Sequence, residues 1–450
     1  MKKVLLLFCA LVVLNACTNE YEQSTISPDI DDEYQLSESF VPFEQAIGNA
    51  DFLFRNIEKE RKRKIQDVRV IKTSDISGVT RSSNEEEPLA YVVNYQNNKG
   101  YAILSATTEL PPIIAIGDNG NFSLDQFVDY MSGNTTRSDG NSLCPEQEFQ
   151  YEIINNSLNL RNSNIVIGPV LPPTNTRDTT IVLKCMPLIP VKWGQGDPYN
   201  RYCYNEENEL CPAGCVPVAC AQTLASLCYH HNHRPSNQID ASYPVDWYVI
   251  NKLIVADTIR YSSGMDTPGV RNIANLVRGI GAKANATYTT SGTSVTDDNI
   301  HRVIDMYEEC GLQNVNLVTN DDPNVVNYLF SNIVNNNYPV DCYARRLKED
   351  GTTTGHCFNA DGWLRLQYTQ SIVEYLTIDG TPTFRDDYKQ YSFDLLHVNF
   401  GWNGVADGYY LPGAFDLTSD EFGGYRECDD LVTDADRNYN LRVRYMFYEL

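Results

Sequence analysis

The stretch PAGCVPVACAQTLASLCY, residues 212–229, predicts a buried helix that begins at a cysteine. After Cys215, apolar side chains recur at the three- and four-residue spacing of one helix face, namely Val218, Ala221, Leu224, Ala225 and Cys228. Gly214 stands before the first turn, and Pro217 stands within it, where a missing backbone N–H costs nothing. We therefore expect the helix to start at Cys215.

A cysteine at the first position of a helix differs chemically from one in the interior. The helix dipole and the unpaired N–H groups of the first turn favour a thiolate there and lower the pKa of the thiol. The backbone N–H of Cys215 also points to where an oxyanion would form when a carbonyl is attacked. Cys220 and Cys228 fall inside the helix and fit the alternative of buried structural thiols. Cys215 is thus the candidate nucleophile among the 13 cysteines.

A nucleophilic thiol needs a base, and His356 is the candidate among the six histidines. It stands in GHCFNADGW, residues 355–363, after a turn-rich loop and at the start of an apolar strand. Further on, the motif HVNFGWNG supplies Asn399 to orient the imidazole and Trp402 to shield the pair from water.

A side-chain amide precedes the nucleophile in WGQGDPYN, residues 193–200. Gln195 in this motif is expected to donate a second hydrogen bond to the oxyanion. The resulting chain order of Gln, Cys, His and Asn is that of papain-like enzymes, which place the histidine far downstream of the cysteine.

Four segments together resemble the streptopain family of bacterial cysteine peptidases, the C10 group: residues 193–200, 214–216, 355–362 and 397–408. The resemblance implies an α+β fold, with a papain-like catalytic domain that has a helical subdomain and an antiparallel β-sheet subdomain. It implies that Cys215 is the nucleophile, His356 the general base and acid, and Gln195 the oxyanion donor. It also implies substrate-binding positions at Ser291, Gly292, Thr293 and Gly355.

The first part of the chain predicts a separate, small α+β domain over residues 39–130. Apolar spacing predicts a helix over residues 41–65, and two β-rich runs around an Asn/Gly turn predict a hairpin over residues 90–106. This hairpin, with the Leu110-Pro-Pro that follows, resembles the inhibitory propeptide of the same family. The domain has no histidine, so we expect no nucleophile chemistry in it.

The segment 131–185 is rich in Asn, Ser, Thr, Gly and Pro and is expected to form a linker that contains the processing site. Residues 186–450 hold all six histidines and are expected to form the protease domain.

The N-terminus has the features of a bacterial lipoprotein signal peptide over residues 1–16. A positive start is followed by an apolar stretch too short to span a bilayer and by small residues before Cys17. Cys17 would be diacylated and would anchor the chain to a membrane, with residues 17–38 as a disordered, acidic tether. The alternative is an ordinary signal peptide with a chance cysteine. We expect an exported lipoprotein of the cell envelope, at the outer membrane or cell surface, whose processed form can be released.

Composition limits the classes of partner and ligand that the chain is expected to bind. The net charge of −24 argues against nucleic acid, because an acidic chain repels phosphate. No cofactor and no metal are expected; His230, His231 and His233 follow the nucleophile's helix and suit its negative end. No apolar run after the N-terminus is long enough for a membrane span.

We therefore expect a lipid-anchored cysteine endopeptidase zymogen that cleaves protein or peptide substrates through an acyl-enzyme, with its own propeptide as intramolecular inhibitor. Phe400 stands where the family usually has tryptophan, and Pro217 where a small residue is commoner. These departures leave open a protease-fold lipoprotein with an impaired site, which binds or inhibits at the cell surface. A second alternative is another Cys-His acyltransferase, such as a transglutaminase-like enzyme.

Overall fold

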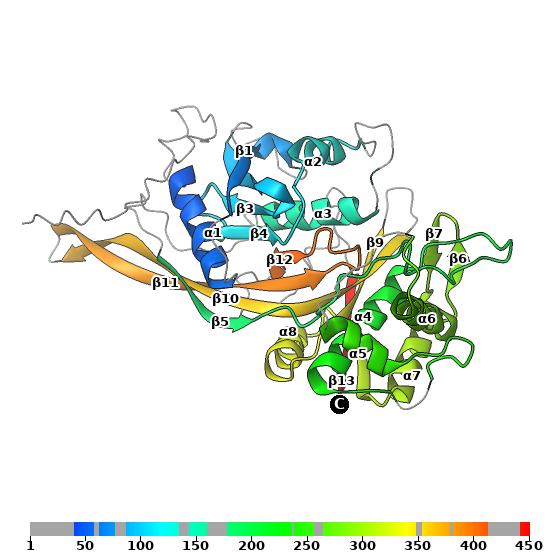
Figure 1. Ribbon diagram of the computed structural model, residues 1–450. Helices are drawn as coiled ribbons and strands as arrows, with labels where there is room; N and C mark the ends of the chain where they lie inside the picture. The colour runs from blue at the N-terminus through cyan, green and yellow to red at the C-terminus, as the bar shows by residue number, and fades with distance from the viewer. Residues whose placement is uncertain are drawn as a thin grey trace, which may run out of the picture.

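The computed structural model (Figure 1) describes residues 40–57, 63–76, 87–134, 143, 145–159, 178–235, 238–255, 264–347, 353–378, 381–412 and 442–450. The predicted signal peptide, Cys17 and the predicted tether lie outside the described residues. Within the described residues, no helix combines the length and the apolar character that crossing a membrane requires.

The N-terminal domain, described residues 40–159, is an antiparallel sheet with three helices around it (Figure 1). Its elements are α1 (Phe43–Ile57), β1 (Ile65–Lys72), β2 (Pro88–Tyr95), β3 (Tyr101–Ser105), β4 (Ile113–Gly117), α2 (Leu124–Met131) and α3 (Pro145–Asn159). The predicted hairpin is present, and its strands pair Ala90 with Ser105. Asn97 and Asn98 close its turn with positive φ, which asparagine tolerates better than most residues.

The helix predicted over residues 41–65 is shorter in the structure. α1 ends at Ile57, and Ile65 already begins β1, which pairs with β2. Arg63 does not end the helix but places its guanidinium 4.0 Å over the ring of Phe54. The β-branched residues of β1 gain a strand partner that no local spacing reveals, and this tertiary pairing overrides the helical pattern.

The segment predicted as a linker contains two ordered elements. α3 packs on β4 of the N-terminal domain, and β5 (Asp178–Cys185) pairs with β10 (Thr353–Ile378) of the large sheet. Residues 160–177, the remainder of the predicted linker before β5, lie outside the described residues. The location of the processing site stays a prediction.

The helical subdomain surrounds α4, and Figure 1 shows it on the right, below the sheet. Its elements are α4 (Cys215–His231), α5 (Trp247–Val255), α6 (Pro268–Lys283), α7 (Ile300–Glu309) and the hairpin of β6 (Thr287–Thr289) and β7 (Gly292–Ser294). α4 contacts α5, α6, β9 (Val340–Leu347) and β10, and all its residues from Val216 to Cys228 are buried.

One antiparallel sheet runs through both domains. The remaining strands are β8 (Gln313–Thr319), β9 (Val340–Leu347), β10 (Thr353–Ile378), β11 (Thr381–Asn399), β12 (Gly408–Tyr410) and β13 (Arg442–Glu449), and α8 (Val325–Phe330) lies between β8 and β9 in the chain. The strand order is β1-β2-β3-β4-β12-β11-β10-β9-β13-β8. β4 therefore adds the sheet of the N-terminal domain to β12, with Ile116 opposite Tyr409.

β10 and β11 form a long hairpin whose outer part projects beyond the body of the molecule (Figure 1). Its inner part sets up the candidate site, because the pairing of Asn359 with Asn399 brings the two downstream motifs side by side. The predicted α+β class, with a helical subdomain beside an antiparallel sheet, is confirmed.

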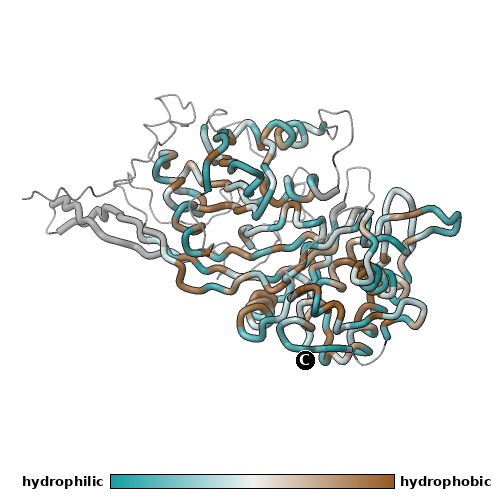
Figure 2. Tube along the Cα trace, in the orientation of Figure 1, coloured by the Kyte–Doolittle hydropathy of each residue, from teal (hydrophilic) through white to brown (hydrophobic). Residues whose placement is uncertain are grey.

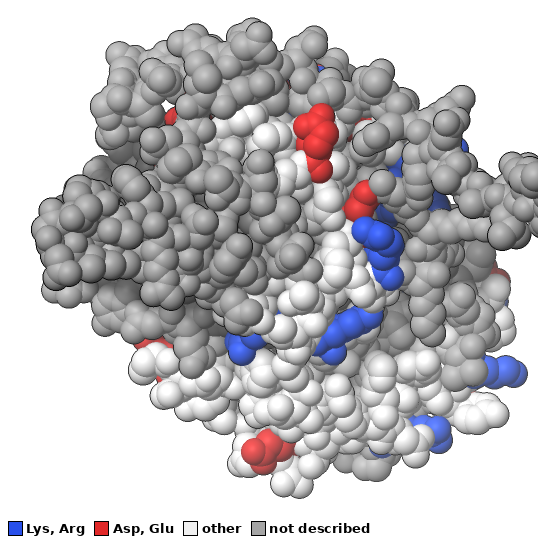
Figure 3. All heavy atoms as spheres, turned by 90° about the vertical axis from the view of Figure 1, so that its left-hand side faces the viewer, with Lys and Arg blue, Asp and Glu red and all other residues white. Residues whose placement is uncertain are grey.

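Two hydrophobic clusters fill the structure, and Figure 2 shows apolar residues along the sheet and within the helical subdomain. The first extends from the N-terminal domain to β9–β12, and the second surrounds α4. On the face in Figure 3, charged side chains of both signs lie scattered among uncharged atoms of the described residues. The acidic net charge therefore does not gather into one patch on the described part of this face.

Candidate active site

Cys215 is the first residue of α4, as predicted, and it is half-buried. Gly214 before it has a φ of 93°, a conformation that favours glycine. A Cβ at this position would lie 2.8 Å from Cγ2 of Thr293. The chain can therefore turn into the helix close beneath the β6–β7 hairpin only with glycine at this position.

The two interior cysteines of α4 differ from Cys215. Cys220 and Cys228 are fully buried, and burial raises the pKa of both thiols. A thiol with a raised pKa stays protonated at neutral pH and is a poor nucleophile. Among these three cysteines, the thiol at the helix start is the one placed for a thiolate.

Gln195 lies beside the start of α4. Its backbone carbonyl accepts a hydrogen bond from the N–H of Ala213 at 2.7 Å, two residues before Cys215. Its segment is held from the other side by Asn403, whose N–H donates to the carbonyl of Trp193 at 3.1 Å. The structure thus brings Gln195 and Cys215 together, although the role of the Gln195 amide stays a prediction.

His356 lies on β10, the strand that packs against α4. The Nδ2 atom of Asn359 donates to the carbonyl of Ala219 on α4 at 3.4 Å, which joins the two elements. Cys357 is close enough to Cys215 to interact with it electrostatically, and burial, together with Asp341 and neighbouring thiols that include Cys215, raises the pKa of the Cys357 thiol. Cys357 belongs to the second hydrophobic cluster, and Cys215 packs against this cluster. Strand and helix therefore bring the two predicted reactive residues into one region.

The imidazole of His356 is held by the turn that follows β11. Its Nε2 lies 3.1 Å from the carbonyl oxygen of Phe400, and because a carbonyl only accepts, Nε2 carries the hydrogen. The ring stacks on Trp402 with centroids 4.2 Å apart and planes 25° apart. Trp402 thus covers one face of the imidazole, which is the position predicted for it.

The structure differs from the prediction for Asn399. Its Nδ2 donates to the carbonyl of Val191 at 3.1 Å, and its Oδ1 accepts from Gln222 and from the N–H of Gly401. The group that bonds His356 is instead the next carbonyl along the chain, that of Phe400. Side chains alternate between the two faces of a strand, and that of Asn399 points away from His356. Its hydrogen bonds shape the turn that directs the Phe400 carbonyl toward the imidazole.

Phe400, the departure from the family pattern, is fully buried beside the histidine. Its ring stacks on Trp402 at 5.0 Å with planes 6° apart. The phenyl ring thus fills an aromatic stack with Trp402 and His356.

An aromatic side chain of the N-terminal domain reaches His356, which the sequence did not predict. Phe149 of α3 meets the imidazole edge to face, with centroids 5.8 Å apart, and also contacts Phe358 and Phe400. Burial lowers the pKa of His356 to about 3, and the hydrogen bond to Phe400 opposes this shift. The imidazole is therefore neutral at neutral pH in this arrangement.

A second contact from the N-terminal domain is ionic. Asp118, directly after β4, lies 3.3 Å from Nζ of Lys192 and 3.4 Å from Nε2 of His397. Nδ1 of His397 lies 2.5 Å from Asp361. Burial alone would raise the pKa of Asp118, but His397 and Lys192 lower it to about 2. Burial alone would lower the pKa of His397, but Asp361 and Asp118 raise it to about 10.

These two shifts define the pH range of the ionic contact. The contribution of Asp118 is complete above its ordinary pKa of 3.8 and is lost as the pH falls to about 2. The contribution of His397 is complete below its ordinary pKa of 6.5 and is lost as the pH rises to about 10. Mild acid therefore leaves this contact between the domains intact.

The predicted substrate-binding residues flank the helix start. Thr293 packs on Gly214, and its hydroxyl donates to the carbonyl of Pro212 at 2.6 Å. Ser291 is exposed and Gly292 half-buried in the same hairpin. Gly355 is exposed on β10, next to His356. All four lie on segments that adjoin Cys215 or His356, and their contacts with substrate stay predictions.

The three histidines near the end of α4 each bond a backbone carbonyl. The acceptors for His230, His231 and His233 are Leu188, Asn337 and Cys310. Among the described residues, no group of His, Cys, Asp and Glu is arranged to hold a metal ion.

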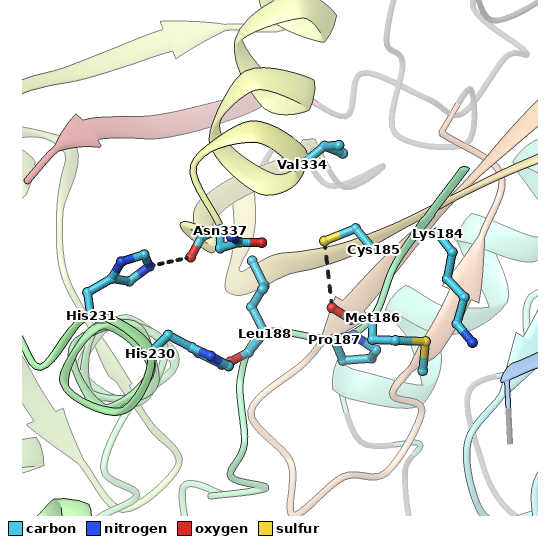
Figure 4. A pocket seen from close by; sticks show the side chains of 9 residues that line it. All are labelled: Lys184, Cys185, Met186, Pro187, Leu188, His230, His231, Val334 and Asn337. Carbon is cyan, nitrogen blue, oxygen red and sulfur yellow. Dashed lines mark hydrogen bonds between the residues drawn. The ribbon is translucent and has the colours of Figure 1, made fainter. Parts of the chain in front are cut away.

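A pocket of about 430 Å³ lies at this end of α4 (Figure 4). Cys185 lines it, with a thiol whose pKa burial raises to about 11. His230 lines it too, about 22 Å along the helix from Cys215 at 1.5 Å per residue. The pocket is therefore separate from the candidate active site.

Comparison with known proteins agrees with this geometry. Residues 193–410 match the model of the peptidase C10 family, and residues 36–133 match that of the Spi protease inhibitor. These two matches confirm the predicted resemblance, in the predicted order along the chain. No match was found among curated proteins.

Two solved structures from Prevotella intermedia are similar to this chain. A prointerpain A fragment is 17% identical, with a TM-score of 0.46, over 85% of this chain and 98% of its own. Active interpain A cysteine protease is 18% identical, with a TM-score of 0.38, over 59% of this chain and 95% of its own.

Proposed function

Because this chain belongs to the peptidase C10 family, and is a cysteine endopeptidase with an N-terminal inhibitory domain, we propose that Cys215 is its nucleophile and His356 its general base. The observation that supports this assignment best is the position of Cys215. It begins α4 next to Gln195, against the strand that carries His356.

The proposed reaction is hydrolysis of a peptide bond in two steps. His356 takes the thiol proton, and the sulfur of Cys215 bonds to the scissile carbonyl carbon. The backbone N–H of Cys215 and the amide of Gln195 stabilise the oxyanion. His356 gives its proton to the leaving amine as the C–N bond breaks. It then takes a proton from water as the water oxygen bonds to the thioester carbon. The C–S bond breaks, the acid product leaves, and the proton on His356 returns to the sulfur to restore the thiol.

We further propose that the N-terminal domain inhibits through His356 as well as by covering the site. A thiolate needs a protonated imidazole beside it, and Phe149 packs edge to face on this half-buried imidazole, which limits its contact with water. Its pKa of about 3 means that the cationic form is scarce at neutral pH. Removal of the domain would hydrate the ring and raise its pKa toward the ordinary value of 6.5.

The test compares the purified full-length chain before and after processing with a peptidyl epoxide that alkylates catalytic thiols. We expect the epoxide to modify Cys215 rapidly in the processed chain and slowly in the intact chain, with labelling measured by mass spectrometry. Rapid labelling of another cysteine, or none after processing, would overturn the assignment. Products formed by acyl transfer to an amine, with no hydrolysis, would favour the transferase alternative.

Phe149→Ala should release activity in the intact chain. Truncating a buried phenylalanine lowers the free energy of unfolding by about 3–5 kcal/mol, and here the lost interactions are those that hold α3 against the site. We therefore expect epoxide labelling of the intact variant to be at least about tenfold faster than that of the intact wild type.

The matched control for Phe149→Ala is Tyr151→Leu. It removes a ring from the same helix that packs on Phe122 and Phe127 inside the N-terminal domain. We expect this variant to lose stability of the domain with a smaller gain in labelling. Equal gains in the two variants would mean that domain stability alone, and not the contact with His356, maintains inhibition.

We propose that the chain is an exported lipoprotein anchored through Cys17, which lies outside the described residues. The order of charged, apolar and small residues before Cys17 supports this. Cys17→Ser should abolish incorporation of radiolabelled palmitate and should move the protein from the membrane to the soluble fraction of a bacterial host. Undiminished labelling of the variant would refute acylation at Cys17.

A further inference from the structure

Gln222 is a fully buried glutamine on α4, two turns beyond Cys215. Both ends of its side-chain amide are used. Oε1 accepts from the backbone N–H of Trp193 at 3.1 Å, and Nε2 donates to Oδ1 of Asn399 at 3.1 Å. A single side chain on the nucleophile's helix is therefore bonded to two segments that are distant in sequence.

The first segment carries the oxyanion residue. Trp193 stands two residues before Gln195, and the carbonyl of Gln195 in turn accepts from Ala213, two residues before α4 begins. The segment between Trp193 and Gln195 is thus fixed at one end to α4 by Gln222 and at the other end to the turn that leads into α4 by Ala213.

The second segment orients the base. Oδ1 of Asn399 accepts from Gln222 and also from the N–H of Gly401 at 3.0 Å. Phe400 lies between Asn399 and Gly401, and its carbonyl accepts the hydrogen bond from Nε2 of His356. A Cβ on Gly401 would lie 3.1 Å from Val218 and 3.7 Å from Nε2 of Gln222, so the turn rests directly on this part of α4.

The hydrogen bonds close into a ring. Nδ2 of Asn399 donates to the carbonyl of Val191, which stands two residues before Trp193. Gln222, Asn399 and residues 191–193 therefore fix one another, and the ring needs a side chain at 222 that both accepts and donates. Glutamine meets this need, whereas an ionised glutamate only accepts and methionine does neither.

We propose that Gln222 is a positioning residue that sets Gln195 and His356 relative to Cys215. The inference rests on the proposed function, since it assigns a role in that same reaction. Gln222 is buried beneath both segments, and it acts through them. An error of about 1 Å in the placement of reacting groups can cost on the order of 100-fold in rate. A buried amide that holds two segments in place on one helix therefore has a large effect on turnover.

The test uses processed Gln222→Met, which keeps the side-chain length and removes both hydrogen bonds. We expect kcat/KM for a peptide substrate to fall about 10- to 100-fold, mostly through kcat, with KM within about threefold of wild type. The acid limb of the kcat/KM profile should also shift, because the carbonyl partner of His356 moves. In a Gln195→Ala background the loss from Gln222→Met should be smaller, because the two changes affect the same interaction.

The matched control is Thr223→Val, the next residue along α4. It is equally buried and loses hydrogen bonds with Asp341 and Asn359 instead. We expect it to lower the unfolding temperature and leave kcat and the pH profile near wild type. Equal loss of kcat in both variants would make Gln222 a merely structural residue and overturn the proposal.

Two further results separate the possible failures. If the epoxide modifies Cys215 in the wild type and Gln222→Met is as fast as wild type, positioning by Gln222 is refuted and the proposed function stands. If the wild type is neither labelled nor active, the proposed function itself fails. Should Gln222→Met not fold, Gln222→Glu replaces it, because it keeps the shape and the acceptor for Trp193; wild-type turnover in that variant would also refute the proposal.

Discussion

Cys215→Ala is expected to abolish peptide hydrolysis by the processed chain, with kcat lower by on the order of 10⁶-fold. The variant keeps the helix start and the backbone N–H that faces the oxyanion, but it has no atom that can form the acyl-enzyme. The other residues of the site contribute little to the rate once the nucleophile is removed, because residues of a catalytic unit act together. Hydrolysis of casein by the purified variant, beside the wild type, measures the loss.

Cys220→Ala provides the matched control for Cys215→Ala. Its thiol lies on the same helix, is fully buried and has a pKa raised well above the ordinary value. We expect it to keep most of the activity while losing some stability, since its sulfur lies 3.5 Å from a carboxylate oxygen of Asp341. Full casein hydrolysis by Cys215→Ala, or loss of activity with Cys220→Ala alone, would show that the nucleophile is assigned to the wrong thiol.

Gln195→Ala should lower kcat by about 10²–10³-fold, the usual effect of removing one oxyanion donor. The amide is expected to bond the oxygen more strongly in the tetrahedral state than in the bound substrate, so KM should change little. Steady-state kinetics on a fluorogenic peptide separate these two constants.

The companion variant for this position is Gln195→Glu. It has nearly the same shape, but its carboxylate cannot donate and repels an oxyanion, so we expect it to be at least as impaired as Gln195→Ala. Wild-type kcat in either variant would exclude Gln195 from the oxyanion site. A rise in KM with unchanged kcat would instead assign the amide to substrate binding.

The start of the nucleophile's helix is a local property, and the sequence predicted it to the residue. Glycine, cysteine and a first-turn proline ahead of apolar residues at helical spacing define the N-terminus without any help from distant parts of the chain. The hairpin of β2 and β3 was predictable for the same reason, since its turn residues and alternating strands are neighbours in sequence.

The errors fall where an element depends on a distant partner. α3 was missed because Asn and Ser around it indicate a linker, although Phe149 and Ile153, and likewise Ile154 and Leu158, are four residues apart as on one helix face; α3 packs on β4. Asn399 was expected to orient His356, but the bond comes from the carbonyl of Phe400. The identity of a residue does not reveal whether its backbone carbonyl accepts a hydrogen bond. The sequence therefore pointed to the nearest side chain that could orient the imidazole.

The contacts between the N-terminal domain and the candidate site depend on tertiary structure for a further reason. Asp118 and Phe149 carry no motif, and they matter because β4 extends the sheet at β12 and α3 lies against the aromatic residues around His356. Such contacts require the register between two domains, which no single segment specifies.

By itself, the sequence determined where α4 begins and which cysteine stands at its start, and it predicted the companion motifs and their order, because helix starts and motifs are properties of neighbouring residues. Only the tertiary structure decided that a carbonyl holds the imidazole, that Phe149 covers it and that Gln222 joins both flanking segments to α4. Each of these depends on contacts between residues far apart in the chain, where packing and strand register, and not local spacing, determine which atoms meet.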